Sequence, residues 1–209
     1  MKNHKIGCIF KFPLLTYLTE ICRKPSNTNL MEFGRIIISE TAANSENLQD
    51  VINSNISVIN LMREEKIDDE FIHEDALMSY YLDYYYSQYV AGNFAQFVHH
   101  SGWNKELNEL IEEGLALIGA EKHLEFFQQQ SKKVKLMSSV KLNKFLNGKL
   151  EGVNPTRDLL NSDTFFEIEE NLVTLNANFL KSHPDFQVLS VDEMFETLEE
   201  FVGHEIKRE

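Results

Sequence analysis

The stretch YYLDYYYSQYVAGNFAQFVHHSGW, residues 80–103, decides the fold of this chain. Nine of its residues are Tyr, Phe or Trp, and they recur at helical spacings such as 80/84, 81/85, 85/89 and 94/97. Tyr and Trp combine a large apolar body with one polar group, so such a helix can fill a core or a subunit contact. We expect residues 91–93 (AGN) to end it, and a second short helix to follow over 94–99. The segment predicts architecture and contains no arrangement of groups that performs chemistry.

Helical periodicity also dominates on both sides of this stretch. Apolar residues repeat at helical spacing over 45–62, and residues 63–75 then form a polar joint with seven acids. Asn104 is a good N-cap for a helix that Gly119 would end, and residues 121–137 continue as another helix into a Lys-rich segment, 132–149. The Gly- and Pro-containing residues 148–155 are the best candidate loop.

Two capping boxes predict the last helices. Thr164 with Glu167 would open a helix that runs to about Ser182, before Pro184. Ser190 with Glu193 opens the clearest amphipathic helix of the chain. Only residues 35–39 and 186–191 could be short strands. We therefore predict an all-α fold, a compact multi-helix bundle around a central Tyr-rich helix, with one or two very short strands at most.

The predicted organisation has three parts. Residues 1–33 are an N-terminal extension, 34–190 a helical domain, and 191–209 a C-terminal acidic amphipathic helix packed on that domain. The apolar run 6–18 is interrupted by Lys11 and Pro13 and no small-residue cleavage site follows it, so a signal peptide is not expected. No stretch is long and apolar enough to span a membrane. Two cysteines suit a reducing, cytoplasmic setting.

The net charge of −13 is unevenly distributed. Residues 1–130 carry 10 Lys and Arg against 19 Asp and Glu, residues 131–162 carry 7 against 2, and residues 163–209 carry 3 against 12. Nucleic acids and anionic membranes select clustered Lys and Arg, so direct binding to either is not expected. The charge predicts a basic partner.

Catalysis is the weaker hypothesis. Glu70 and His73 have the Glu-x-x-His spacing of carboxylate-bridged di-metal bundles, but those sites need a second copy, which this chain lacks. His99 and His100 precede Ser101, yet sequence neighbours point apart on a helix. No Gly-x-Ser-x-Gly, Gly-rich phosphate loop or His-Glu-x-x-His motif is present. We expect no catalytic residue, metal or cofactor. The alternative is an enzyme with a metal or acid/base site near Glu70, His73, His99 and His100.

The acids of the last helix are not interleaved with basic residues. Pairs such as Asp192/Glu196 and Glu196/Glu200 are three or four residues apart, where like charges cost a few tenths of a kcal/mol. Stability alone would favour mixed signs. Two interpretations are open. In the first, the chain is a helical interaction module whose acids serve solubility alone. In the second, the carboxylates of this face imitate phosphate groups.

Several segments resemble a bacterial family named after a DNA-mimic protein, most of whose members are known only as a domain of unknown function. The resemblance covers about residues 34–190 and is carried by RIIISETAANS (35–45), VINSNISVINLMREE (51–65), ALMSYYLDYYYSQYVAGNFAQFVHHSGWN (76–104), ELIEEGLALIGAEKH (109–123) and ENLVTLNANFLKSHPDF (170–186). It is most specific at the Tyr-rich stretch and at GAEKH, residues 119–123.

This resemblance implies an all-helical homodimer whose carboxylates imitate duplex DNA. The named member occupies the DNA-binding surface of a helix-turn-helix transcription factor and relieves its repression. Duplex DNA carries one charge per about 1.7 Å, so 13 charges correspond to about 22 Å, whereas half-sites lie about 34 Å apart. A dimer would correspond to about 44 Å.

The partner-binding acids that we nominate come from this sequence and not from the family. They are the acids of the joint and the outward acids of the last helix: Glu64, Glu65, Asp68, Asp69, Glu70, Glu74, Asp75, Asp192, Glu193, Glu196, Glu199 and Glu200.

Overall fold

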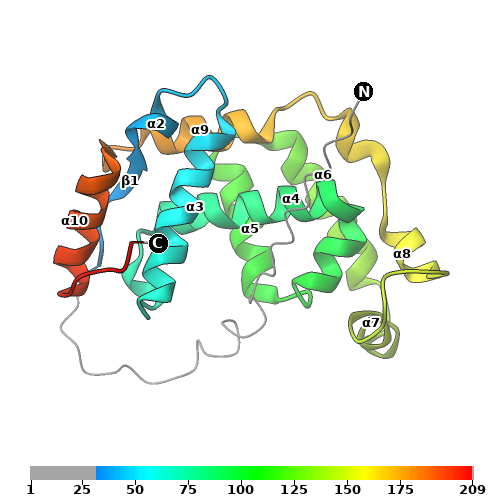
Figure 1. The fold of residues 1–209 in the computed structure, drawn as a ribbon. Helices are drawn as coiled ribbons and strands as arrows, with labels where there is room; N and C mark the ends of the chain where they lie inside the picture. The colour runs from blue at the N-terminus through cyan, green and yellow to red at the C-terminus, as the bar shows by residue number, and fades with distance from the viewer. Residues whose placement is uncertain (1–31, 209) are drawn as a thin grey trace, which may run out of the picture.

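The chain is described by a computed structural model over residues 32–208 (Figure 1). The helices of this part are α2 (Glu40–Ala43), α3 (Gln49–Glu64), α4 (Glu74–His100), α5 (Lys105–Leu117), α6 (Glu121–Lys135), α7 (Ser139–Leu146), α8 (Pro155–Leu160), α9 (Leu172–Ser182) and α10 (Val191–Val202). Two 3₁₀ turns, η1 (Asp69–Phe71) and η2 (Asp163–Glu167), and two strands, β1 (Ile36–Ser39) and β2 (Phe186–Leu189), complete it. The predicted all-α fold is confirmed.

The aromatic helix α4 lies at the centre of the bundle, as its sequence predicts. Helices α3, α5 and α9 pack against it (Figure 1). Tyr85, Tyr89 and Phe97 of α4 are completely buried, and the ring of Tyr89 stacks on Phe165 of η2 at 3.9 Å between centroids. The Tyr89 hydroxyl donates to the carbonyl of Ser162 at 2.7 Å, which satisfies its polar group inside the core.

Two buried amides fix the neighbouring helices to the first half of α4. Asn55 of α3 donates to the carbonyl of Ala76 at 2.9 Å, and Asn176 of α9 donates to the carbonyl of Ser79 at 3.0 Å. Each carbonyl has a second lone pair beside its helical bond, so the amides add contacts without breaking the helix. These bonds set the register of α3 and α9 along α4.

A kink divides α4 where the sequence predicts a stop. Gly92 and Asn93 have non-helical backbone angles, and Asn93 has φ 66° and ψ −171°. The side-chain oxygen of Asn93 accepts the N–H groups of Phe94 (2.7 Å) and Ser162 (2.9 Å), and that of Asn161 accepts the N–H of Ala95 (3.1 Å). The donors released by the kink are thereby satisfied, and the segment before η2 is fixed against α4.

The helix boundaries follow the predicted caps with one exception. Asn104 caps α5, α9 ends at Ser182 before Pro184, and Ser190 with Glu193 forms the capping box of α10. The capping box predicted at Thr164 is wrong, because residues 163–167 form the turn η2 and α9 begins only at Leu172. The turn places Phe165 against Tyr89, so tertiary packing overrides the local signal.

The two predicted strands form a small parallel sheet. Ile36 pairs with Phe186 and Ser39 with Leu189. Because β2 leads directly into α10, this pairing places the last helix beside the first described residues. The ring of Phe201 of α10 packs edge-on against Phe33 at 5.0 Å.

Replacement of Asn93 tests the kink. Asn93→Ala removes the acceptor for two N–H groups and keeps the unfavourable backbone, so we expect a loss of about 2–4 kcal/mol in the free energy of unfolding. Asn93→Gly loses the same acceptor but relieves the backbone, and should cost less. Urea unfolding measures both. Equal losses of stability in the two variants would show that the backbone at Asn93 is not strained. The control is Asn143→Ala, at an exposed position on α7.

A second stability test concerns Asp83 in the middle of α4. Burial raises the pKa of its carboxyl, although Gln49 donates to it at 2.8 Å and opposes the shift. A carboxyl with a raised pKa destabilises the fold when ionised, and this penalty declines as the pH falls through the folded-state pKa.

We therefore expect Asp83→Asn, which retains the oxygen that accepts from Gln49, to raise Tm at neutral pH. The difference from the parent protein should shrink as the pH is lowered toward the acid range. Thermal unfolding monitored by circular dichroism at a series of pH values measures this effect. An unchanged or lower Tm at neutral pH would contradict it.

Candidate partner-binding surface

The structure brings the two predicted acidic segments together at one end of the molecule. His204, just after α10, contacts Glu65 at 2.7 Å between Nε2 and Oε2. The N–H of Phe33 donates to the carbonyl of Phe71 at 2.7 Å, while its ring packs on α10. Segments 64–75 and 192–200, far apart in sequence, are thus neighbours, and we call them together the acidic end.

Three acids of the first segment are already paired within the protein. Asp69 receives both the Nε and Nη2 of Arg63, at 2.8 and 2.7 Å, and the hydroxyl of Tyr81 at 3.0 Å. Asp75 contacts Nε2 of His183 at 2.8 Å, and Glu65 contacts His204. These carboxylates hold the end of α3 and the start of α4, and each already has a partner within the protein.

Three acids of the last helix also have internal contacts. Glu193 closes the capping box with Ser190, and this hydrogen bond lowers the pKa of its carboxyl. Asp192 pairs with Arg208 at 2.8 Å, and Glu199 accepts the N–H of Ile206 at 3.1 Å. Asp192 and Glu199 anchor the chain that follows α10.

The other six nominated acids are exposed and form no ion pair or side-chain hydrogen bond with residues 32–208: Glu64, Asp68, Glu70, Glu74, Glu196 and Glu200. Two further exposed acids without such contacts adjoin them, Glu32 and Glu205. Sequence periodicity could not nominate these two, because each lies outside a helix and is positioned by the packing of Phe33 on Phe201. Lys66 and Lys207 are also exposed near these acids.

The Lys-rich segment lies on the opposite side of the molecule. Figure 1 shows α7, which carries Lys141 and Lys144, and α10 at opposite sides. Lys132, Lys133 and Lys135 end α6, directly before α7. The fold therefore separates the Lys-rich segment from the acidic end.

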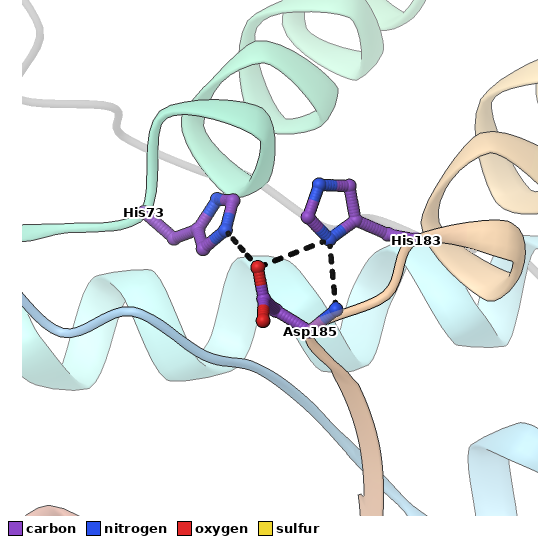
Figure 2. Close-up of side chains that lie close together, drawn as sticks. All are labelled: His73, His183 and Asp185. Carbon is purple, nitrogen blue, oxygen red and sulfur yellow. Dashed lines mark hydrogen bonds and ion pairs between the residues drawn. The ribbon is translucent and has the colours of Figure 1, made fainter.

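A cluster of His73, His183 and Asp185 joins the start of α4 to the turn between α9 and β2 (Figure 2). His73 Nε2 lies 3.5 Å and His183 Nδ1 3.8 Å from Asp185 Oδ2. In the sequence His73 suggests a pair with Glu70, but in the structure its neighbours are His183 and Asp185.

The hydrogen bonds of the cluster define the proton positions on both rings. His73 Nδ1 accepts the N–H of Asp75 at 3.1 Å, so the proton of the neutral ring is on Nε2. His183 Nδ1 accepts the N–H of Asp185 at 3.1 Å, and its Nε2–H faces Asp75. A metal would require His73 Nε2 to lose its proton and would lie at the positive end of α4. This arrangement is better suited to holding the start of α4 against the turn between α9 and β2 than to binding a metal.

The other histidines considered for chemistry lie far from this cluster, at the last turn of α4. His100 Nδ1 is 2.7 Å from Oε1 of Gln88, and His99 Nε2 is 2.9 Å from the carbonyl of Gly148. Burial, followed by the neighbouring His99, lowers the pKa of His100. The structure therefore does not bring Glu70, His73, His99 and His100 into one site.

Comparison with known proteins identifies the family. A family model described as DMP19-like protein matches residues 65–183, more than half of the chain. The chain belongs to the DMP19-like family. This is a family of DNA-mimic proteins and is not known as a family of enzymes. No curated protein and no solved structure matches the chain.

The DMP19-like match includes the Lys-rich segment and the joint from Glu65 onward, but ends before α10. The resemblance seen in the sequence is confirmed over these residues. Glu196 and Glu200 therefore belong to α10, which lies outside the matched region. The parallel pairing of β1 with β2 places this helix at the acidic end.

None of the helices in residues 32–208 combines the length and apolarity needed to cross a lipid bilayer.

The GAEKH motif, by which the family resemblance is most specific, has a structural role. Gly119 ends α5 with φ +74°, a conformation that favours glycine. At the start of α6 the N–H groups of Lys122 and His123 donate to the carboxylate of Glu170, at 2.9 and 3.2 Å. The motif thus connects α5, α6 and the segment before α9, and does not contribute to the acidic end.

The contact between the segment after α10 and the end of α3 can be tested at His204. The Glu65 carboxylate beside its ring raises the pKa of His204. We expect Glu65→Gln to lower this pKa toward the ordinary value for histidine, because the neutral amide no longer favours the charged ring. NMR titration of the His204 ring protons measures the change, with exposed Glu113→Gln on α5 as control. An unaltered pKa would show that the two segments do not meet in solution.

Proposed function

We propose that this protein is an acidic DNA mimic that binds the DNA-binding surface of a transcription regulator, or of another nucleic-acid-binding protein, and blocks its access to DNA. It acts in the cytoplasm, as a homodimer and without catalysis. Membership of the DMP19-like family supports the general role. The observation that carries the proposal for this chain is the set of unpaired carboxylates at the acidic end, on the side away from the Lys-rich segment.

The number of these carboxylates suits one recognition element. The eight exposed acids without internal contacts would match about 14 Å of duplex at one charge per about 1.7 Å. A major groove is about 12 Å wide and admits one helix. One acidic end therefore suffices for one DNA-reading helix but not for two half-sites about 34 Å apart. A dimer that presents two acidic ends could bind the DNA-reading helices of both half-sites.

The test begins with capture of partners from the source cell's lysate at low and high salt, followed by binding measurements with the identified protein. We expect affinity to fall linearly on a log–log plot against salt, because the acidic end replaces DNA and its counter-ions. Labelled operator DNA should compete for the same partner. Salt-insensitive binding, or a complex that still holds DNA, would contradict the proposal.

Charge reversal identifies the surface. The triple variant Glu70→Lys, Glu196→Lys and Glu200→Lys should lower the affinity by about tenfold or more and reduce the salt slope by roughly three. The matched control reverses three exposed acids of α5 and α6, Glu106, Glu113 and Glu121, and changes the net charge equally. Equal loss in both variants would show that only total charge matters and would reject the acidic end as the site.

A further inference from the structure

An apolar groove of about 600 Å³ lies between α3 and α10, next to the end of β1 and the start of α2. Val58 and Leu61 of α3 line one side of it. One face of α10 forms the other side, because its lining residues are spaced as neighbours on a helix: Val191, Met194, Phe195 and Leu198. Val191 is 56% exposed. The groove therefore presents apolar surface that a further apolar segment would bury.

The groove offers apolar contacts and not free charge. Glu196 and Glu200 are on the opposite face of α10 from the lining residues. Asp50, which lines the groove, accepts the hydroxyl of Ser45 at 2.6 Å. The two acids of α10 that flank the groove already contact the chain that follows the helix. Because each of these flanking acids has a partner, we expect the occupant to be an apolar segment.

The described part of the chain begins at one end of the same α10 face. The ring of Phe33 packs on Phe201 at 5.0 Å, and Phe201 follows Leu198 by three residues. From Val191 to Phe201 this face is about 15 Å long, at 1.5 Å per residue. The chain that precedes Phe33 is therefore attached at one end of the groove face.

This preceding chain contains an apolar run, IGCIFKFPLLTYL, residues 6–18. The run lies outside the described residues, and Lys11 is its single charged residue. Every second position from Ile6 to Leu14 is apolar. In an extended segment, such alternation places all of these side chains on one side. The run therefore has the composition and the spacing to cover an apolar groove.

The linker from this run to the groove face is long enough. Residues 19–32 span up to about 46 Å when extended, which exceeds the length of the groove face. A linker of this length holds the run at a local concentration in roughly the millimolar range. Even a weak apolar contact would then be occupied within one chain, without a separate partner.

We propose that residues 6–18 dock in the groove of their own chain, with their alternating apolar side chains against Val58, Leu61 and the α10 face. Burial of apolar surface drives this contact, so it depends little on salt. The inference does not rest on the proposed function, because the groove and the exposed acids of α10 are on opposite faces of the helix. Docking covers the apolar side of α10 and leaves the acidic end accessible.

The two cysteines of the chain provide matched probes. Cys8 belongs to the docked run and Cys22 to the linker, and Cys22→Ser or Cys8→Ser leaves one thiol in the full chain. We expect an aromatic disulfide reagent to modify Cys8 about tenfold more slowly than Cys22, because it reaches Cys8 only when the run is undocked. In urea the two rates should be equal. Equal rates in the native protein would overturn the proposal and leave the groove to a separate partner.

Filling the groove shows where Cys8 is protected. Ser57 is exposed and lines the groove, so Ser57→Trp should fill it without disturbing the core. Combined with Cys22→Ser, it should raise the rate at Cys8 by about tenfold, to that of Cys22. Asn143→Trp, at an exposed position on α7, is the matched control and should leave Cys8 protected. If Cys8 stayed protected in Ser57→Trp, its protection would arise elsewhere and the proposal would be rejected.

Protein concentration separates docking within one chain from docking on a second copy. Protection of Cys8 within one chain should be the same at every dilution, because the linker sets the local concentration. Protection that is lost on dilution would show that the run binds the groove of another copy, which would also overturn the proposal.

Discussion

The packing of Tyr89 is the constraint on which the rest of the structure depends. Its ring stacks on Phe165 and its hydroxyl reaches the carbonyl of Ser162, so one side chain joins α4 to the irregular segment before η2. In that segment the side chain of Asn161 accepts the N–H of Ala95 at the kink, and the N–H of Ser162 donates to the side chain of Asn93. A phenylalanine could fill the same space but would leave the Ser162 carbonyl without this partner. The polar group of the tyrosine therefore decides where the chain turns, and the aromatic body decides how tightly it packs.

Charge separation follows from the positions of short elements and not from a separate acidic domain. The parallel pairing of β1 with β2 carries the chain into α10, and Phe33 packs on Phe201, so the acids of the last helix come to lie beside the joint. The lysines at the end of α6 and on α7 belong to the other half of the bundle (Figure 1). A chain of only moderate net charge can in this way present a strongly negative end.

Local patterns predicted the elements well, and long-range contacts explain what they missed. The aromatic spacing in α4, the Asn104 cap and the Ser190 box involve residues within a few positions of one another, and each is confirmed. The Thr164 box failed because Phe165 is required in the core. The pairing of Asp75 with His183 and of Glu65 with His204 joins residues more than 100 positions apart. No periodicity can show which acids have such distant partners. Half of the nominated carboxylates prove to have contacts within the protein.

The contact between His204 and Glu65 also couples proton binding to recognition. The carboxylate favours the imidazolium, and any cationic group that a partner brings beside Glu65 competes with that imidazolium for the same oxygens. Complex formation at this point would release a proton to the solvent. The measured heat of association would then depend on the ionisation enthalpy of the buffer. Calorimetry in different buffers would therefore detect binding at the Glu65–His204 contact.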